Sequence, residues 1–329
     1  MLRPKIIEQL FDIVDETTMT LAAELQTGYL HGMIESCQNI TSREIRQNLG
    51  ADSKDLLQKN YDVLEELGFA QEEVRKALQL AVLKGLKADK VANAAMTPDS
   101  IAFMAGYVLS KFIKSIDGKR VGDLTVGTGN FLTAILNQLP GAADAVYGVD
   151  PDPDLIRIAY VLADMQEHSI QFYQQSSLGP LFIDPLDAIV SDLPIGSATE
   201  EELTGTELSL AAQGIDYLPH LLIENHLNYL KPGGYGLYVI PNNLFERDPQ
   251  GIFHKFLTKN VHIQALLQLP SSLFQAAEEE KSLFVIQKKG PDVRPVPEVL
   301  IARLPRFTDQ EKISRMLGRI EDWVLAHKK

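Results

Sequence analysis

The chain has 329 residues, a formal net charge of −13 and a single cysteine, Cys37. A single cysteine excludes disulfides within the chain, and the sequence has no Cys/His cluster with metal-ligand spacing. It also has no apolar run near the roughly 20 residues that cross a bilayer. We therefore expect a cytoplasmic protein without a metal or membrane contact. The acidic charge also opposes tight, independent binding to the phosphates of DNA.

Residues 1–93 have the spacing of helices throughout. Apolar residues such as Ile6, Leu10 and Ile13 recur at helical intervals. Polar residues lie between them, whereas a signal sequence would have a continuous apolar run. We therefore expect a helical amino-terminal domain over 1–93 and a second domain over 94–329. The first domain is either a surface for a substrate or partner or a stabilising appendage.

A new helix is expected to begin after Thr97 and to run through Phe112. Thr97 is a typical N-cap residue, and Pro98 suits the first helical position. Because the first N–H groups of a helix have no partner within it, they could also receive a carboxylate such as that of a methionine group. Thr97 is therefore a candidate cofactor-binding residue.

The segment 120–132, with the sequence RVGDLTVGTGNFL, is the most informative in the chain. It has the pattern of a short buried strand, a glycine turn at Gly127 and Gly129, and the start of a helix. A second apolar run, 145–149, ends in Asp150. Glycines let a ligand approach bare backbone, and an acid at the tip of the second strand is placed for ribose hydroxyls. These features predict a site for an adenosine-containing ligand.

The residues around the glycine turn discriminate between adenosine ligands. Leu132 replaces the third glycine of a dinucleotide fingerprint, which disfavours a nicotinamide-dependent oxidoreductase. Asn130 and Phe131 stand where a nucleoside triphosphate site needs lysine and then serine or threonine. Asp123 adds a negative charge that repels pyrophosphate and attracts a sulfonium or ammonium group. S-adenosylmethionine is therefore the expected cofactor.

The rest of the chain alternates strands with helices. Helices are expected over 131–139, 153–167, 216–230 and from 308 onward, and strands over 145–150, 170–174, 186–191 and 235–240. Two later strands, 262–269 and 282–288, are joined by a short polar loop and should pair as an antiparallel hairpin at the sheet edge. We expect an α/β, Rossmann-like sheet of seven strands, mainly parallel and covered by helices on both faces.

The order of motifs along 94–290 resembles that of adenine-specific DNA methyltransferases. The matching residues are Thr97-Pro98, the glycine turn with Asp123, then Asp150, and then Asp192-Leu193-Pro194. The similarity is greatest to the methylation subunits of type I restriction-modification systems, and it extends to LKPGGY from residue 230, IPNNLF from 240 and LPSSLF from 269. The resemblance implies an S-adenosylmethionine-dependent methyltransferase fold, with 1–93 corresponding to the helical domain of such subunits.

The resemblance also implies roles for individual residues. In the family, the first residue of an Asn/Asp/Ser-Pro-Pro-aromatic motif and the next carbonyl accept hydrogen bonds from an exocyclic amine, while the aromatic ring stacks on the extruded base. Here Asp192 and the carbonyl of Leu193 would hold the amine, and Pro194 would keep the turn rigid. The candidate cofactor-binding residues are Thr97, Asp123, Thr125, Gly127, Gly129, Asn130, Phe131, Asp150 and Pro151.

The sequence departs from the family pattern at several positions. Leu193 replaces the first proline and Ile195 replaces the aromatic residue, so base stacking worth roughly 1–3 kcal/mol is missing. The segment after the third strand, where the family has an acid or asparagine for the adenine amino group, is QQSSL from residue 174. Because only a short stretch follows the last predicted strand, we expect no target-recognition domain.

Two functions remain open on this evidence. The first is an S-adenosylmethionine-dependent N-methyltransferase related to the adenine-specific DNA methylases, acting on a nucleic-acid base or on a protein or small-molecule amine. The second is a catalytically degenerate member of the fold with an interaction or regulatory role. The expected partner is nucleic acid, bound weakly because the chain is acidic, or another protein.

Overall fold

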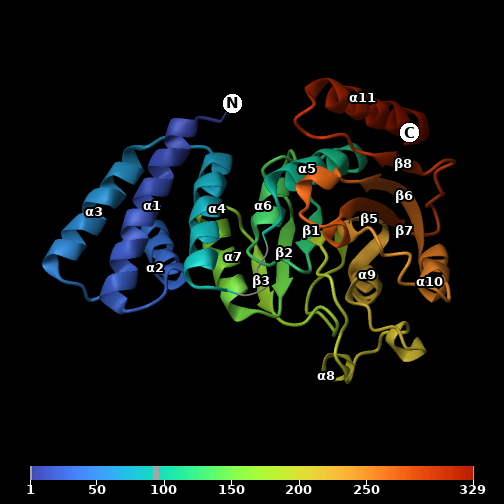
Figure 1. Cartoon of the computed structure of the whole chain (residues 1–329), viewed down its shortest axis with the longest axis horizontal. Coiled ribbons are helices and arrows are strands. Elements are labelled where there is room, and N and C mark those ends of the chain that lie inside the picture. The colour runs from blue at the N-terminus through green and yellow to red at the C-terminus, as the bar shows by residue number, and fades with distance from the viewer. Residues whose placement is uncertain (1, 92–95, 329) are drawn as a thin grey trace.

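The structure is a computed structural model, and it describes residues 2–91 and 96–328. Four amino-terminal helices lie at one end of an elongated molecule, and a sheet flanked by helices forms the other end (Figure 1). The predicted domain boundary between 93 and 94 falls outside the described residues and stays a prediction. Among the described residues, no helix has both the length and the apolar composition needed to span a bilayer.

The amino-terminal region is helical, as the spacing of its apolar residues predicts. Its helices are α1 (Pro4–Leu25), α2 (Tyr29–Ser42), α3 (Ala51–Glu66) and α4 (Gln71–Ala88). Their shared core includes Leu10, Met33 and Leu78, and it continues into Ile158 and Leu162 of α7 (Pro153–Met165). The helical region is therefore joined to the rest of the molecule by a buried apolar contact.

One eight-stranded sheet runs through the described part of 96–328, in the order β3-β2-β1-β4-β5-β7-β6-β8. The strands are β1 (Arg120–Asp123), β2 (Ala145–Asp150), β3 (Gln171–Gln174), β4 (Leu186–Asp192), β5 (Leu230–Pro241), β6 (Val261–Gln268), β7 (Lys281–Lys288) and β8 (Leu300–Arg303). Strands β1 to β5 pair in parallel, whereas β7 lies antiparallel to both β5 and β6. The mainly parallel sheet and its antiparallel hairpin are thus confirmed.

The far end of the sheet differs from the prediction. The hairpin of β6 and β7 is not at the edge, because β8 pairs in parallel with β6 and makes an eighth strand. β8 is only four residues long and follows a segment with prolines at 291, 295 and 297, and its short apolar run at 299–302 was not predicted as a strand.

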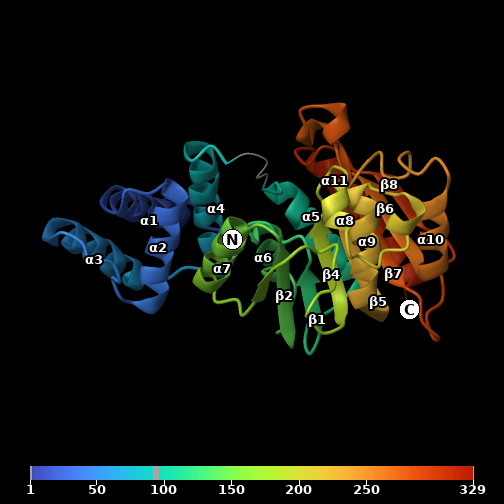
Figure 2. The ribbon, with the colours of Figure 1, turned by 90° about the horizontal axis from the view of Figure 1, so that it is seen from below.

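Helices cover both faces of the sheet (Figure 2). On one face, α5 (Asp99–Phe112), α6 (Asn130–Leu136) and α11 (Gln310–His327) pack against strand residues such as Val121 and Val190. On the other face, α9 (Leu218–Tyr229) and α10 (Ile252–Asn260) pack against Leu124 and Ile189. Ile189 and Val190 are adjacent in β4 and face opposite ways, as the pleat of a strand requires. Short helices complete the chain: α8 (Glu200–Leu203), η1 (Ala211–Gln213), η2 (Ser271–Leu273) and η3 (Ala277–Glu279).

Candidate active site

The glycine turn joins β1 to α6 and presents its backbone to Asp150. Gly127 and Gly129 have φ angles of +52° and +77°, which side chains other than glycine rarely adopt. The N–H of Gly127 donates to Asp150 Oδ2 over 2.9 Å, and the N–H of Asp152 donates to the other carboxylate oxygen over 3.0 Å. At Gly129 a Cβ atom would stand 3.1 Å from that of Ala159 in α7, so this glycine also permits close helix packing.

A pocket of about 300 Å³ opens beside this turn, and we call it the glycine-turn pocket. It lies at the carboxyl ends of β1 to β4, where open parallel sheets bind their ligands. Its lining consists of Thr125, Gly127, Thr128, Asp150, Pro151, Leu155, Ser176, Ser177, Leu178, Pro194, Glu202, Leu218 and Leu222. The set combines bare backbone and a carboxylate with several apolar side chains, which suits a ligand that has both polar and apolar parts.

Asp123 lies buried below the glycine-turn pocket and does not line it. Burial raises the pKa of Asp123 to about 7, although it accepts hydrogen bonds from the Thr125 N–H at 3.0 Å and from Ser191 Oγ at 2.9 Å. Burial also raises the pKa of Asp150. Two carboxyl groups that resist ionisation near one pocket would both be stabilised in their charged form by a cationic ligand.

Asp192 is held at both carboxylate oxygens. Its Oδ2 accepts a hydrogen bond from Thr97 Oγ1 over 2.8 Å, and its Oδ1 accepts one from Lys281 Nζ over 2.5 Å. Thr125 Oγ1 donates to the Asp192 carbonyl over 3.3 Å, which ties the turn after β4 to the glycine turn. Thr97 does not act as the predicted helix cap, because α5 begins at Asp99 with no side-chain cap and the Thr97 hydroxyl is used by Asp192.

Of the two departures in the turn after β4, the one at Leu193 has a structural explanation. The N–H of Leu193 donates to the Val239 carbonyl over 3.0 Å, which continues the pairing of β4 with β5 by one residue and which proline could not do. The Leu193 side chain is completely buried in the core below. Ile195 is 48 % exposed and provides no ring for a base to stack on. Pro194 lies between them and lines the glycine-turn pocket.

Asn130 and Phe131, also predicted to contact the cofactor, lie behind the glycine-turn pocket. Phe131 packs into the core, and Asn130 is buried with its Oδ1 accepting from Arg75 Nη1 over 2.6 Å. Arg75 belongs to α4, is fully buried, and also binds Glu72 at 2.6 Å and Asp99 at 3.0 Å. Asn130 Nδ2 in turn donates to the Thr97 carbonyl over 3.4 Å. A chain of polar contacts therefore runs from the helical region to the residue that holds Asp192.

Several residues of this site are not predicted from the sequence. Leu218 and Leu222 line the glycine-turn pocket from α9, far along the chain from the motifs. Lys281 has a signal that only the strand order reveals: Asp192 pairs with Val239 of β5, and Lys281 pairs with Pro241 of the same strand. The register of three neighbouring strands thus brings the ammonium to the carboxylate.

A doubly wound sheet with an antiparallel β7 inserted between β5 and β6, and a glycine turn beside an acid at the tip of β2, defines the class I S-adenosylmethionine-dependent methyltransferase fold. The family model described as N-6 DNA Methylase matches residues 87–317, and the model described as YtxK N-terminal helical domain matches residues 8–86. The chain belongs to the N-6 DNA methylase family, which confirms the resemblance found in its motifs.

Individual relatives agree with this assignment. The chain is 35 % identical over 320 residues to the uncharacterized protein YtxK of Bacillus subtilis, covering 97 % of each chain. It is also 35 % identical to a proposed class I S-adenosylmethionine-dependent methyltransferase from Listeria monocytogenes, whose crystal structure matches with a TM-score of 0.85 over 98 % of this chain and all of the other. A modification subunit of a proposed type I restriction enzyme from Vibrio vulnificus shares the fold at 16 % identity and a TM-score of 0.63, covering 81 % of this chain and 62 % of the subunit.

Proposed function

We propose that this protein is an S-adenosylmethionine-dependent N-methyltransferase that binds the methyl donor in the glycine-turn pocket. One observation carries the proposal: two parts of the predicted site line the same pocket. The first is the Gly127 turn, which faces Asp150, and the second is Pro194, which follows Asp192 by two residues. Donor-binding backbone and the turn that would hold an acceptor therefore border one space. Membership of the N-6 DNA methylase family supports the same reaction class.

The residues of the pocket fit this donor. Asp150 would receive the ribose hydroxyls, and the bare backbone at Gly127 would permit close approach of the ligand. Ser176 offers a hydroxyl and Leu155 an apolar wall for the adenine. S-adenosylmethionine supplies a methyl group on a positively charged sulfur, and the buried carboxyl of Asp123 favours such a charge nearby.

Asp192 would orient the acceptor. One of its oxygens, together with the carbonyl of Leu193, would accept hydrogen bonds from an amine and so direct the nitrogen lone pair toward the methyl carbon. Because Lys281 Nζ already donates to Asp192 Oδ1, an incoming amine has to share or replace that contact. We propose an amine nitrogen as the acceptor, with the base amine of the related DNA methylases as the first class to test.

The experiment is a tritiated-methyl transfer assay on cell extract, on DNA and on RNA. We expect label with the natural protein and a loss of at least about a hundredfold with Asp192→Ala, since removal of a positioned hydrogen-bond acceptor commonly has that effect. Asp55→Ala, an exposed acid on α3, is the matched control. Equal labelling by the natural protein and the Asp192 variant would remove Asp192 from the mechanism.

One observation favours a second function, a methyltransferase fold that binds the donor without transferring its methyl group. Both Asp192 oxygens are engaged within the protein, by Thr97 and Lys281, and Ile195 takes the place of the stacking ring. This alternative predicts donor binding with no transfer to any class of acceptor. The same assay, combined with donor titration, separates the two functions.

A further inference from the structure

A second pocket lies at the opposite edge of the sheet from the glycine-turn pocket. It occupies about 540 Å³ at the amino-terminal ends of β1 and β4 and at the start of β5. We call it the lysine pocket, and its lining consists of Phe112, Ile113, Lys114, Ser115, Asp117, Lys119, Asp187, Lys231, Pro232, Gly233, Gly234 and Tyr235. Five of these residues, 231–235, belong to the LKPGGY segment that begins at residue 230, and the proposed methyl transfer does not use this pocket.

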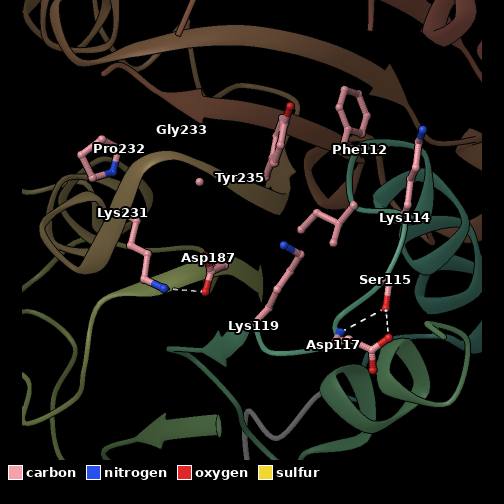
Figure 3. Close-up of a pocket in the computed structure, with 12 residues that line it drawn as sticks. Phe112, Lys114, Ser115, Asp117, Lys119, Asp187, Lys231, Pro232, Gly233 and Tyr235 are labelled. Atoms are coloured by element: carbon pink, nitrogen blue, oxygen red, sulfur yellow. Dashed lines mark hydrogen bonds and ion pairs between the residues drawn. The ribbon is translucent and has the colours of Figure 1, made fainter. Parts of the chain in front are cut away.

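Three lysines line this pocket in a chain whose net charge is −13: Lys114 and Lys119 come from the loop between α5 and β1, and Lys231 comes from β5. Figure 3 shows Lys231 directed at Asp187, Lys119 directed into the space below Tyr235, and Lys114 beside Phe112. Within 2–91 and 96–328, neither Lys114 nor Lys119 forms an ion pair. The ammonium groups of both lysines are therefore available to a ligand.

The two aspartates of the lysine pocket do not cancel this positive charge. Asp117 accepts from Ser115 Oγ and from the Ala142 N–H, both at 2.8 Å, and so faces its own loop. Asp187 accepts from the Arg120 N–H at 2.9 Å and from Lys231 Nζ at 2.7 Å. Although burial opposes its ionisation, these contacts and the charge of Lys119 lower the pKa of Asp187. Asp187 is thus already paired with Lys231 and leaves the ammonium groups of Lys114 and Lys119 without a carboxylate partner among the described residues.

A fourth lysine stands on the aromatic rim of the pocket. Lys328 Nζ lies 5.0 Å from the ring centre of Tyr235 and 5.6 Å from that of Phe112, and it donates to Tyr235 Oη over 3.1 Å. Among the described residues no carboxylate pairs with it, and burial lowers the pKa of Lys328 to about 8. Because no acid is paired with the Lys328 ammonium, a bound anion would stabilise its charged form.

We infer that the lysine pocket binds a phosphorylated small molecule of nucleotide size. Lysine is a common phosphate ligand, and the lysines that line the pocket suit a chain of phosphates. The volume lies within the range of small-molecule sites and exceeds the needs of a single inorganic phosphate. Phe112 and Tyr235 add apolar rings for the remainder of the ligand. The inference is independent of the proposed methyl transfer.

The test is calorimetric titration of the full chain with uridine triphosphate and, separately, with tripolyphosphate. S-adenosylhomocysteine is present throughout, so that the glycine-turn pocket is filled. Uridine triphosphate is chosen because it contains no adenosine and so does not mimic the ligand expected in that pocket. We expect binding of both probes that Lys119→Gln weakens by about tenfold, as the loss of one charged hydrogen bond implies. Lys54→Gln, which removes an exposed lysine from α3, should leave both affinities unchanged.

The outcomes separate the sources of the phosphate. Tighter binding of uridine triphosphate than of tripolyphosphate would assign a nucleotide, and equal binding would assign a polyphosphate, so either result supports the pocket. Absence of heat from both probes, or the same affinity in Lys119→Gln and Lys54→Gln, would overturn the inference. A single-stranded oligonucleotide is titrated in the same way. If it binds and neither small probe does, the inference is also overturned, because the pocket would then be part of a nucleic-acid surface.

Discussion

Lys281 Nζ lies 2.5 Å from Asp192 Oδ1 and joins the first residue of β7 to the last residue of β4. The side chains of both residues are about one-fifth exposed, so the ion pair is largely shielded from water. In the proposed reaction Asp192 would accept a hydrogen bond from the substrate amine. In this protein an amine of the chain itself already makes such a contact.

Replacement of Lys281 by methionine should destabilise the fold and change the acceptor site. Loss of the ammonium leaves Asp192 with Thr97 as its remaining side-chain donor, and we expect the free energy of unfolding to fall by about 1–3 kcal/mol. Urea denaturation measures this change, and Lys281→Arg is the control that keeps the charge. If the methionine variant is as stable as the natural protein, the ion pair contributes nothing.

Asp123 should make the stability of the protein depend on pH. Its pKa of about 7 in the folded protein lies above the unfolded value, so the folded state binds more protons between these two values. Stability should therefore fall as the pH rises from about 4 to about 7, by roughly 2–4 kcal/mol at most, and Asp123→Asn should flatten that slope. Urea titrations across this pH range measure the slope, and equal slopes in both proteins would contradict the prediction.

The same carboxyl group should couple donor binding to pH. A cationic ligand near Asp123 and Asp150 favours their charged forms, so binding should release protons and should tighten as the pH rises toward 7. Calorimetry in buffers with different ionisation enthalpies counts the protons released. An affinity that stays constant over this range would show that neither carboxyl group senses the ligand's charge.

Gly129→Ala should damage the glycine turn through two separate effects. The residue has a φ angle of +77°, and the new Cβ would stand 3.1 Å from that of Ala159, so we expect a loss of about 1–3 kcal/mol and weaker donor binding. Gly318→Ala is the matched control, because Gly318 lies in α11 with open space around it and should gain about 0.5–1 kcal/mol. Thermal unfolding compares the two variants, and equal shifts would contradict the argument.

Arg75 should link the helical region to the site. Arg75→Met removes the partner of Glu72, Asp99 and Asn130 from a buried position, and we expect a loss of about 3–5 kcal/mol. Arg75→Lys keeps the charge and not the planar fork, so its effect should be intermediate. Denaturation measures the stability, and a methionine variant as stable as the natural protein would indicate that the polar chain from α4 is dispensable.

The sequence predicted those parts of the protein that depend on local pattern. The turn at Gly127, the acid at Asp150 and the alternation of strands and helices follow from residues close together in the chain. Thr97 was predicted as a helix cap and is not one, because Asp192, remote in sequence, takes its hydroxyl. Lys281 and Arg75 reach the site through strand order and helix packing, and single-sequence patterns carry neither.

The most direct test of the account is a calorimetric titration of the purified protein with S-adenosylmethionine. We expect a single site that Asp150→Asn weakens by about tenfold, because the variant keeps an acceptor for the Gly127 N–H but loses the charge that would bind the ribose. Asp152→Asn, next to it at the start of α7, is the control. No heat of binding with the natural protein, or equal affinity in the Asp150 variant, would contradict the assignment of the glycine-turn pocket to the methyl donor.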